Sequence, residues 1–502
     1  MRVLRGALVA LGAFWVAPAV AQLRDGATIT TSRYTIDLYQ GPVLAGTRVI
    51  GLGGAFVAIG EGVDGNSQNP AAPAVRTPES NSHIDYDLGF GLTFPATLKN
   101  SDFFNSGRRT NLASTSQTPT NSIFDQARAT LSLSGFAFLN AEANAQIGRW
   151  GFGLTADLQE YSLSRTTSDR LLAQIAVVHA QLAHAFADHQ LMVGIGTRSV
   201  TMSVQNQNVS DAQQRTLFST TGAGFETGFL WRPNEQHFRI GGAFRTAVTS
   251  RATDSAAPIL YQDDPDNQLY LPQHVSLPWD LNLGFAVQLG PRPFNPRWVD
   301  PEDELARLKR FLRWRELERE RRRRFELART ELEQGDVQAA ARALDVELGT
   351  EALLDEGTLE RAELRLDQET RRKNLAQARF RMLVTTSLVI TGLVPDAVGV
   401  ESFLDRTVQR SGQRISLSPR IGVETETVPG WLTLRSGSYI EPSRFLSGNE
   451  GARVHLTLGL DQRLFPWRVF GLWPEGNIWR ASGSLDAARN YFGWGVAIGI
   501  WH

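Results

Sequence analysis

The side chains best suited to acid–base or metal chemistry are the eight histidines and a few closely spaced carboxylates. His179, His184 and His189 lie near one another, but a strand would place His179 and His184 on opposite faces. Asp85 and Asp87 share one face, a spacing that solvated polar residues show far more often than catalytic pairs do. The sequence contains no H-E-x-x-H, G-x-S-x-G or P-loop pattern. We therefore expect no catalytic site, no metal site and no cofactor.

The composition excludes several other classes of protein. The 502 residues include no Cys, which rules out a disulfide framework, a cysteine zinc site and a thiol nucleophile. Lys and Arg number 51 against 52 Asp and Glu, a balance that argues against nucleic-acid binding, which depends on a basic surface. After the N-terminus no apolar run reaches the roughly 18 residues of a membrane-spanning helix.

The first 21 residues have the pattern of a secretory signal peptide. Arg2 and Arg5 form a positive start, residues 6–16 are apolar, and residues 19–21 (Ala-Val-Ala) form a small-residue cleavage site. The apolar part is too short for a stable membrane span. We expect cleavage after Ala21 and a mature chain in a bacterial envelope, with an uncleaved anchor as the alternative.

Alternation of apolar with small or polar residues runs through most of the remaining chain. In residues 84–94, Ile, Tyr, Leu and Phe alternate with Asp, Gly and Thr, and residues 281–289, 454–461 and 492–500 repeat the pattern. Successive strand side chains point to opposite faces, so each segment has one bulky apolar face. The other face is rich in Gly, Ser and Arg, as a hydrated lumen would be. The pattern favours a transmembrane β-barrel, and a secreted soluble β-protein is the alternative.

Fourteen such segments can be counted, an even number as in bacterial outer-membrane barrels. If both termini are periplasmic, connections after odd strands face outward, and these include the long polar segments 97–127 and 250–277. Connections after even strands include tight turns such as 188–189, as is usual for barrels. We expect strands one to eight in residues 81–290 and strands nine to fourteen in residues 382–502. The strand centres lie near residues 88, 134, 154, 179, 197, 225, 242, 284, 388, 419, 436, 458, 481 and 496.

Residues 291–381 interrupt this pattern after the eighth strand, which places them in the periplasm. Within them, residues 301–380 hold 18 Lys or Arg and 19 Asp or Glu, about 46 % against about 16 % elsewhere. Asp300, Pro301 and the acids that follow predict a helix start. Further helices are expected over 337–348 and 358–379, and residues 325–348 resemble a single tetratricopeptide-type unit.

A cluster of arginines in this insert allows two interpretations. It can be a docking arm that meets an acidic periplasmic protein, or part of a solvated helical hairpin that caps the barrel mouth. The residues concerned are Arg319, Arg321, Arg322, Arg323 and Arg324.

Residues 45–72 read AGTRVIGLGGAFVAIGEGVDGNSQNPAA. The segment resembles the N-terminal signature of the outer-membrane long-chain fatty-acid transporter superfamily (FadL-like), which includes aromatic-hydrocarbon channels and the type IX secretion barrel shuttle. Residues 434–444 resemble a late strand and turn of the same superfamily. The resemblance implies a 14-stranded barrel with residues 22–80 folded into the lumen as a plug or hatch. The matching plug residues include Gly51, Gly53, Gly54, Ala55, Asn69 and Pro70.

The end of the chain resembles the signal that the barrel assembly machinery reads. Large residues stand at alternate positions, although such barrels usually finish on Phe or Trp. Outer-membrane lipid and the assembly machinery are therefore expected partners. The positions are Trp494, Val496, Ile498, Ile500 and His502.

Together these observations predict a protein of the cell outer membrane that passively admits hydrophobic small molecules resembling long-chain fatty acids. The alternative is a scaffold or shuttle that binds periplasmic or secreted partners through the charged insert. An outer-membrane enzyme is a third and weaker hypothesis.

Overall fold

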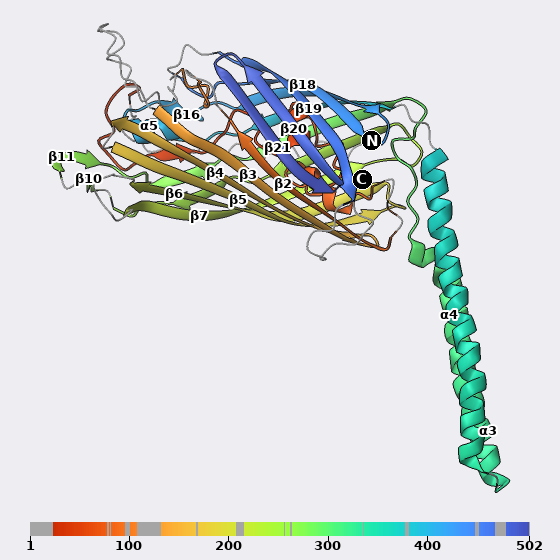
Figure 1. Ribbon diagram of the computed structural model, residues 1–502. Coiled ribbons are helices and arrows are strands. Elements are labelled where there is room, and N and C mark those ends of the chain that lie inside the picture. Colours follow the sequence, from red (N-terminus) through yellow and green to blue (C-terminus); the bar gives the residue numbers. More distant parts are fainter. Residues whose placement is uncertain are drawn as a thin grey trace, which may run out of the picture.

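The structure, a computed structural model, describes residues 24–77, 80, 82–95, 101–107, 132–166, 169–206, 215–255, 257–261, 264–334, 336–376, 381–446, 451–466 and 478–500. Its largest part is a closed barrel of fourteen antiparallel strands, and a long helical hairpin projects from one end (Figure 1). The predicted signal peptide and His502 lie outside the described residues.

The barrel strands are neighbours in chain order, and the first pairs with the last to close the wall. Each of the fourteen predicted strand centres falls within one of them, so the predicted fold class is confirmed. The strands are β2 (Ile84–Phe94), β3 (Ser132–Ile147), β4 (Trp150–Thr166), β5 (Asp169–Phe186), β6 (Leu191–Asn206), β7 (Arg215–Trp231), β8 (Phe238–Arg245), β13 (Asp280–Leu289), β14 (Met382–Thr391), β17 (Ser416–Val428), β18 (Leu432–Glu441), β19 (Arg453–Pro466), β20 (Ile478–Ala488) and β21 (Tyr491–Ile500).

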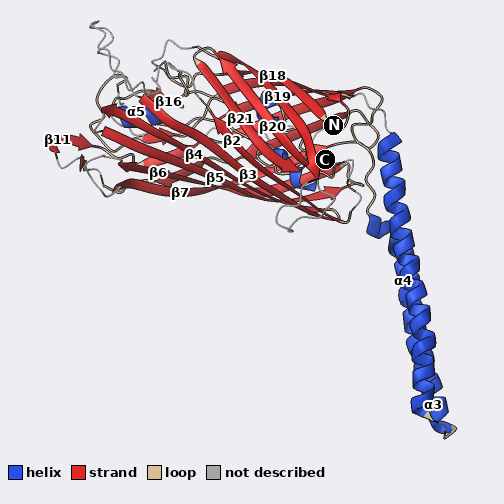
Figure 2. Ribbon diagram, in the orientation of Figure 1, coloured by secondary structure: helices blue, strands red, loops and turns tan. Residues whose placement is uncertain are grey.

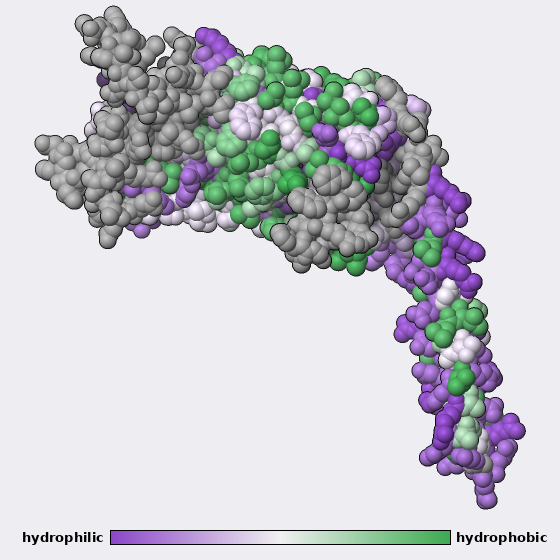
Figure 3. All heavy atoms as spheres, in the orientation of Figure 1, coloured by the Kyte–Doolittle hydropathy of each residue, from purple (hydrophilic) through white to green (hydrophobic). Residues whose placement is uncertain are grey.

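The outward faces of these strands are apolar. On β6, Val193 and Ile195 are 38 % and 49 % exposed. The residues that alternate with them face inward, and one of these, Met192, is fully buried. Figure 3 shows apolar residues spread over the visible barrel wall and mainly hydrophilic residues on the hairpin. A closed sheet pairs its backbone hydrogen-bonding groups. Its outer apolar band can therefore face lipid.

A second, smaller sheet lies at the end of the barrel opposite the hairpin. We call that end the outer end and the hairpin end the periplasmic end, following the predicted orientation. The sheet orders its strands β16-β15-β1-β12-β9, and β1 is parallel to both of its neighbours. The predicted loop 250–277 thus contributes strands to a cover over the barrel. The bounds are β1 (Thr35–Asp37), β9 (Val248–Arg251), β12 (His274–Leu277), β15 (Ala397–Gly399), β16 (Arg410–Ser411), the separate pair β10 (Ile259–Tyr261) and β11 (Asp264–Leu269), and helix α5 (Val400–Asp405).

Residues 43–76, which we call the plug, pass through the barrel interior. They form α1 (Thr47–Gly51) and two single turns, η1 (Val63–Gly65) and η2 (Ala72–Ala74). Helix α1 contacts β18, β19 and β20, η1 contacts β2 and β3, and η2 contacts β3 to β6. The plug therefore touches the wall on several sides.

The insert is a hairpin of two long helices, α3 (Pro301–Leu332) and α4 (Val337–Ala376), shown in blue in Figure 2. Asp300 caps α3 as predicted, because its Oδ1 accepts a hydrogen bond from the Glu302 amide at 2.9 Å. The expectation of separate helices over 337–348 and 358–379 is wrong, since α4 runs unbroken through Gly349 and Gly357. No described helix is both long and apolar enough to span a membrane.

Candidate functional site in the barrel lumen

The residues of the 45–72 segment lie against the inner wall of the barrel. Gly53 has a φ of +62°, and a Cβ there would meet the backbone of Ser438 on β18. The Ala55 carbonyl accepts a hydrogen bond from Thr385 of β14. Asn69 donates from Nδ2 to the carbonyls of Val57 (2.8 Å) and Phe229 (2.9 Å), which ties the plug to β7. Gly51, Gly54 and Pro70 also approach the wall, at β19, at Arg420 of β17 and at β6 respectively.

Gly437 on β18 offers a direct test of this close packing. A Cβ at Gly437 would overlap the main chain of Leu52 in the plug. We expect Gly437→Val to displace the plug and to destabilise the folded barrel by about 1–3 kcal/mol through overpacking. The measurement is the temperature at which heat-modifiable gel mobility is lost. Gly483→Val is the matched control, because its Cβ meets only ordinary contacts at 3.8 Å and beyond; equal effects of the two changes would contradict the packing described.

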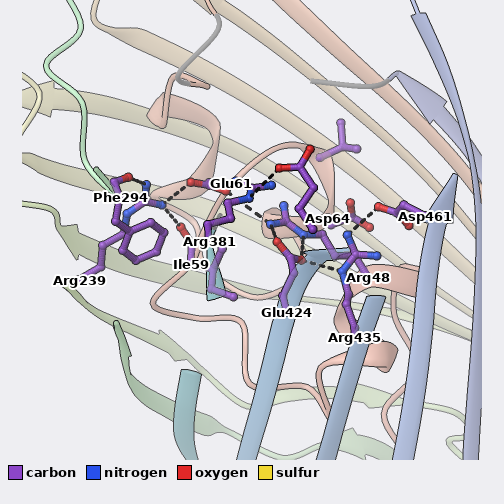
Figure 4. A network of polar contacts seen from close by, with 12 residues as sticks. Arg48, Ile59, Glu61, Asp64, Arg239, Phe294, Arg381, Glu424, Arg435 and Asp461 are labelled. Carbon is purple, nitrogen blue, oxygen red and sulfur yellow. Dashed lines mark hydrogen bonds and ion pairs between the residues drawn. The ribbon is translucent and has the colours of Figure 1, made fainter. Parts of the chain in front are cut away.

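A continuous chain of ion pairs joins the plug to the wall (Figure 4). It alternates four arginines with four carboxylates, so its formal charge is zero. Three members belong to the plug and the others to the wall. In order they are Arg239, Glu61, Arg48, Glu424, Arg435, Asp461, Arg480 and Asp64.

Arg435, at the centre of this ion-pair chain, pairs with a carboxylate on each side. The Arg435 guanidinium lies 2.6 Å from Glu424 and 2.6 Å from Asp461, and Arg48 lies 3.0 Å from Glu424. Burial alone would raise the pKa of Glu61, but the charges of Arg239 and Arg48 outweigh it and hold that pKa below its usual value. The plug is therefore seated by charged contacts that resist dissociation, since a buried charge that loses its partner is costly.

The inward side chains of the wall change from polar to apolar along the barrel axis. On β3 the buried inward residues toward the periplasmic end are polar, as with Asn144 and Glu142, whereas toward the outer end they are Phe138 and Phe136. On β5 the inward residues change in the same direction, from Gln181 to the apolar Ile175 and Leu171. A water-filled barrel has a polar lumen throughout, so the outer half of this lumen differs from a water-filled channel.

We call the apolar cluster in the outer half of the lumen the outer apolar core. Inward side chains of β3 to β7 meet the N-terminal segment and the outer sheet there, and all are at most 8 % exposed. The wall contributes Phe136, Tyr161, Leu171, Ala173, Ile175, Val200, Met202, Val204 and Phe218, and the covering segments contribute Ile29, Tyr34, Ile36, Leu38, Val275, Val398 and Phe403 among others.

A shallow apolar hollow of about 260 Å³ lies in the barrel wall where the first and last strands meet. Leu88, Phe90 and Ile498 contribute to its sides, and Gly89 and Glu142 also line it. Among the described residues, β2 pairs with β21 from Gly89 to Phe94, beside this hollow.

The described histidines of residues 179–189 lie on different sides of the barrel wall. His179 faces inward, 2.9 Å from Glu226, whereas His184 packs its ring against Trp150, as the predicted opposite parity requires. Buried His455 lies 2.6 Å from Glu441 and 2.8 Å from Asp486, a contact that sequence spacing did not reveal. Within the described part of the chain, no three His, Asp or Glu side chains are placed to hold a metal ion.

Two other sets of predicted residues can be located. Trp494, Val496 and Ile498 point outward from β21, and Ile500 is buried. The arginine cluster pairs with acids of the hairpin itself: Arg319 with Asp355, Arg321 with Glu318, Arg322 with Glu347 and Glu351, Arg323 with Asp345, and Arg324 with Glu320. Its charges are therefore largely satisfied without a partner protein.

A buried histidine at a periplasmic turn predicts acid sensitivity. Burial lowers the pKa of His189 to about 4, and three neighbouring arginines act in the same direction. These are Arg232, Arg76 and Arg149, and Asp188 opposes them. Because the unfolded histidine binds a proton below about pH 6.5, the turn should lose stability as the pH falls from about 6.5 to about 4.

The measurement for this prediction is amide hydrogen exchange in residues 187–190 as a function of pH. The protection factors of these amides, which correct for the intrinsic pH dependence of exchange, should fall over that interval in the native protein, and His189→Gln should abolish that fall. An identical pH dependence in the variant would show that His189 is not responsible.

A closed wall of fourteen strands, apolar outside and filled by its own N-terminal segment, defines a plugged membrane-spanning β-barrel of the outer-membrane type. No family model and no curated protein matches the sequence.

Solved structures similar to this chain include a Pseudomonas aeruginosa FadL homologue, with a TM-score of 0.45, 10 % identity and coverage of 95 % of this chain and 99 % of that one. The P. putida toluene transporter TodX has a TM-score of 0.44 and 9 % identity, covering 92 % and 98 %. The CymD monoaromatic hydrocarbon channel has a TM-score of 0.44 and 9 % identity, covering 92 % and 97 %.

Proposed function

We propose that this protein is an outer-membrane channel through which hydrophobic small molecules pass without covalent chemistry. The supporting observation is the outer apolar core, which replaces the polar lumen of a water-filled barrel with Phe, Leu, Val and Met side chains. Sites for hydrophobic ligands are lined in this way, with few polar groups. Long-chain fatty acids are the proposed substrates, on the strength of the resemblance of residues 45–72.

The proposed route begins at the outer end. A hydrophobic molecule would replace contacts between the covering segments and the wall, for example those of Phe403 with Phe218, whose ring centroids are 5.7 Å apart. It would then reach the plug, which closes the polar half of the lumen. Release follows either past the plug to the periplasm or sideways through the apolar hollow beside Gly89.

The test is uptake into liposomes that contain the purified protein. We expect a long-chain fatty acid to enter faster than into protein-free liposomes, while a sugar of similar mass does not. Protein lacking residues 45–72 serves as the second sample, because loss of the plug should also admit the sugar. If fatty-acid uptake is the same with and without the protein, this function is wrong.

A second candidate function is that of a scaffold, and exposed aromatic residues on the hairpin favour it. Phe311, Trp314 and Phe325 are 52 %, 56 % and 67 % exposed, and with Leu332 they occupy a and d positions of one heptad frame. Residues 307–329 carry eleven Lys or Arg against four Asp or Glu. Most of them pair with acids of the hairpin itself, but Arg307, Arg310 and Arg313, which flank Phe311 in the sequence, form no ion pair with a described acid. The chemistry fits an acidic amphipathic helix of a periplasmic protein, whose apolar stripe would cover these rings.

A synthetic heptad peptide with Leu at a and d and Glu at e and g tests this second function. Its fluorescence anisotropy should rise with the protein, and the triple change of Phe311, Trp314 and Phe325 to Ser should abolish the rise. Leu353→Ser on α4 is the control. Equal binding of a Lys-flanked peptide, or no binding of either, would exclude the proposed partner.

A further inference from the structure

The first root of the hairpin, residues 290–300, is packed into the plug. Phe294 is 4 % exposed and belongs to one buried cluster with Ile50, Phe56 and Ile59 of the plug. Its ring also packs against the Arg239 guanidinium, whose central carbon lies 3.8 Å from the ring centroid. Figure 4 shows the two side chains next to each other. The root is therefore part of the plug's own hydrophobic core.

A single guanidinium holds both segments. Arg239, fully buried on β8, donates to the Ile59 carbonyl at 2.8 Å and lies 2.7 Å from Glu61, both in the plug. The same side chain donates to the Phe294 carbonyl at 2.8 Å and to Asn295 Oδ1 at 2.6 Å, both in the root. Moving the root away from the wall would therefore break contacts on the group that also fixes Glu61.

A second arginine, Arg232, joins the C-terminal end of the plug to the root in the same way. Arg232 donates to the Arg76 carbonyl at 3.2 Å and to the Pro296 carbonyl at 3.0 Å, again joining plug and root. The Arg76 guanidinium lies 4.6 Å above the Trp298 ring. Asp300, the cap of α3, lies 2.9 Å from His83 at the start of the barrel.

The second root is Arg381, where the chain returns from α4 to β14, and it reaches the same carboxylate as the first root. Arg381 lies 3.6 Å and Arg292 lies 3.5 Å from Glu426, so one carboxylate joins the two roots at the base of the hairpin. Figure 4 shows Arg381 beside the ion-pair chain that seats the plug. Helix α3 thus begins beside groups that contact the plug, and Arg381, which follows α4, shares Glu426 with Arg292 of the first root.

We infer that the first root of the hairpin, residues 290–300, latches the plug in its closed position, so that the hairpin is the element through which the periplasm controls the plug. The inference concerns movement of the plug and holds whatever solute the barrel passes. Release of the root from Arg239 and Arg232 frees Ile59, Glu61 and Arg76 together. A hairpin held away from the barrel mouth would then favour an open lumen.

The absence of Cys allows a direct test with one introduced reporter. Ala58, in the plug, is 1 % exposed, so Ala58→Cys in the full-length folded protein should react slowly with a maleimide. We expect Phe294→Ala to raise that reaction rate at least tenfold and Asn295→Ala to raise it less. Val299→Ala, on the same root but 44 % exposed, should leave it unchanged.

Heat-modifiable gel mobility confirms that each variant retains a folded barrel. An unchanged maleimide rate in folded Phe294→Ala and Asn295→Ala would overturn the latch, and so would an equal acceleration by Val299→Ala. The reporter measures plug exposure and not transport. A failure of fatty-acid uptake with an intact response of Ala58→Cys would therefore overturn the channel function and leave the latch standing.

Discussion

Replacing Met202 by Asn is expected to slow the uptake of a hydrophobic solute about tenfold. Met202 is 1 % exposed and faces the outer apolar core from β6. An amide placed there has no hydrogen-bond partner among apolar neighbours, and a hydrophobic solute that passes it must strip the water that hydrates it. A penalty of about 1.4 kcal/mol in the rate-limiting step corresponds to a tenfold slower rate. The measurement is liposome uptake of a long-chain fatty acid.

Thr201→Asn is the matched control for Met202→Asn. The two residues are adjacent on β6 and point to opposite sides of the wall, so both variants gain the same amide but only one gains it in the lumen. Uptake through Thr201→Asn should equal that of the native protein. If both variants slow uptake equally, or neither does, hydrophobic solutes do not pass through the outer apolar core.

Replacing Arg435 by Ala has the second large expected effect. The change leaves Glu424 and Asp461 buried at the centre of the ion-pair chain without their shortest partner, and loss of one member of a buried pair costs about 3–5 kcal/mol. We expect the plug to leave its seat, because Arg48 alone must then balance Glu424. Ion conductance across planar bilayers should rise from a closed level to frequent openings.

Arg414→Ala controls for the loss of one positive charge, because Arg414 is exposed at the outer end. Its conductance should match that of the native protein. The combined change Arg435→Met with Glu424→Gln should restore part of the closed state, since it removes a charge of each sign. Closed behaviour in Arg435→Ala itself would mean that the ion pairs do not hold the plug.

The barrel could be predicted from the sequence because lipid imposes a period of two on every strand. Even β5 and β20, whose patterns are less regular, were located at residues 179 and 481. Each strand needs one apolar face wherever it crosses the membrane, and this requirement is local. The same rule could not indicate the outer sheet, whose strands of two to four residues are too short to show a period.

The contents of the lumen depend on contacts between distant residues. Arg48 and Glu424 are 376 positions apart, and no spacing rule brings them together. The glycines of residues 51–54 did indicate close approach, and the structure places Leu52 and Gly53 against Gly437 and Ser438. Which residues the glycines approach, and which charges surround them, follows only from closure of the barrel.

The outer apolar core was missed for a different reason. Periodicity separates two faces of a strand, and it predicts that the bulky face meets lipid. On β3, Phe136 and Phe138 share the inward parity of Asn144, so the polar-to-apolar change occurs within one face. The signal present in the sequence was a bulky residue at an inward position near one end of several strands.

Photoaffinity labelling tests the central claim most directly. A long-chain fatty acid with a diazirine near its methyl end is added to the reconstituted protein, irradiated, and mapped by mass spectrometry. The account predicts labels on inward residues of the outer apolar core, such as Met202, Ile175 and Phe218, which excess unlabelled fatty acid suppresses. Labels confined to outward residues such as Ile195, and unaffected by competitor, would contradict it.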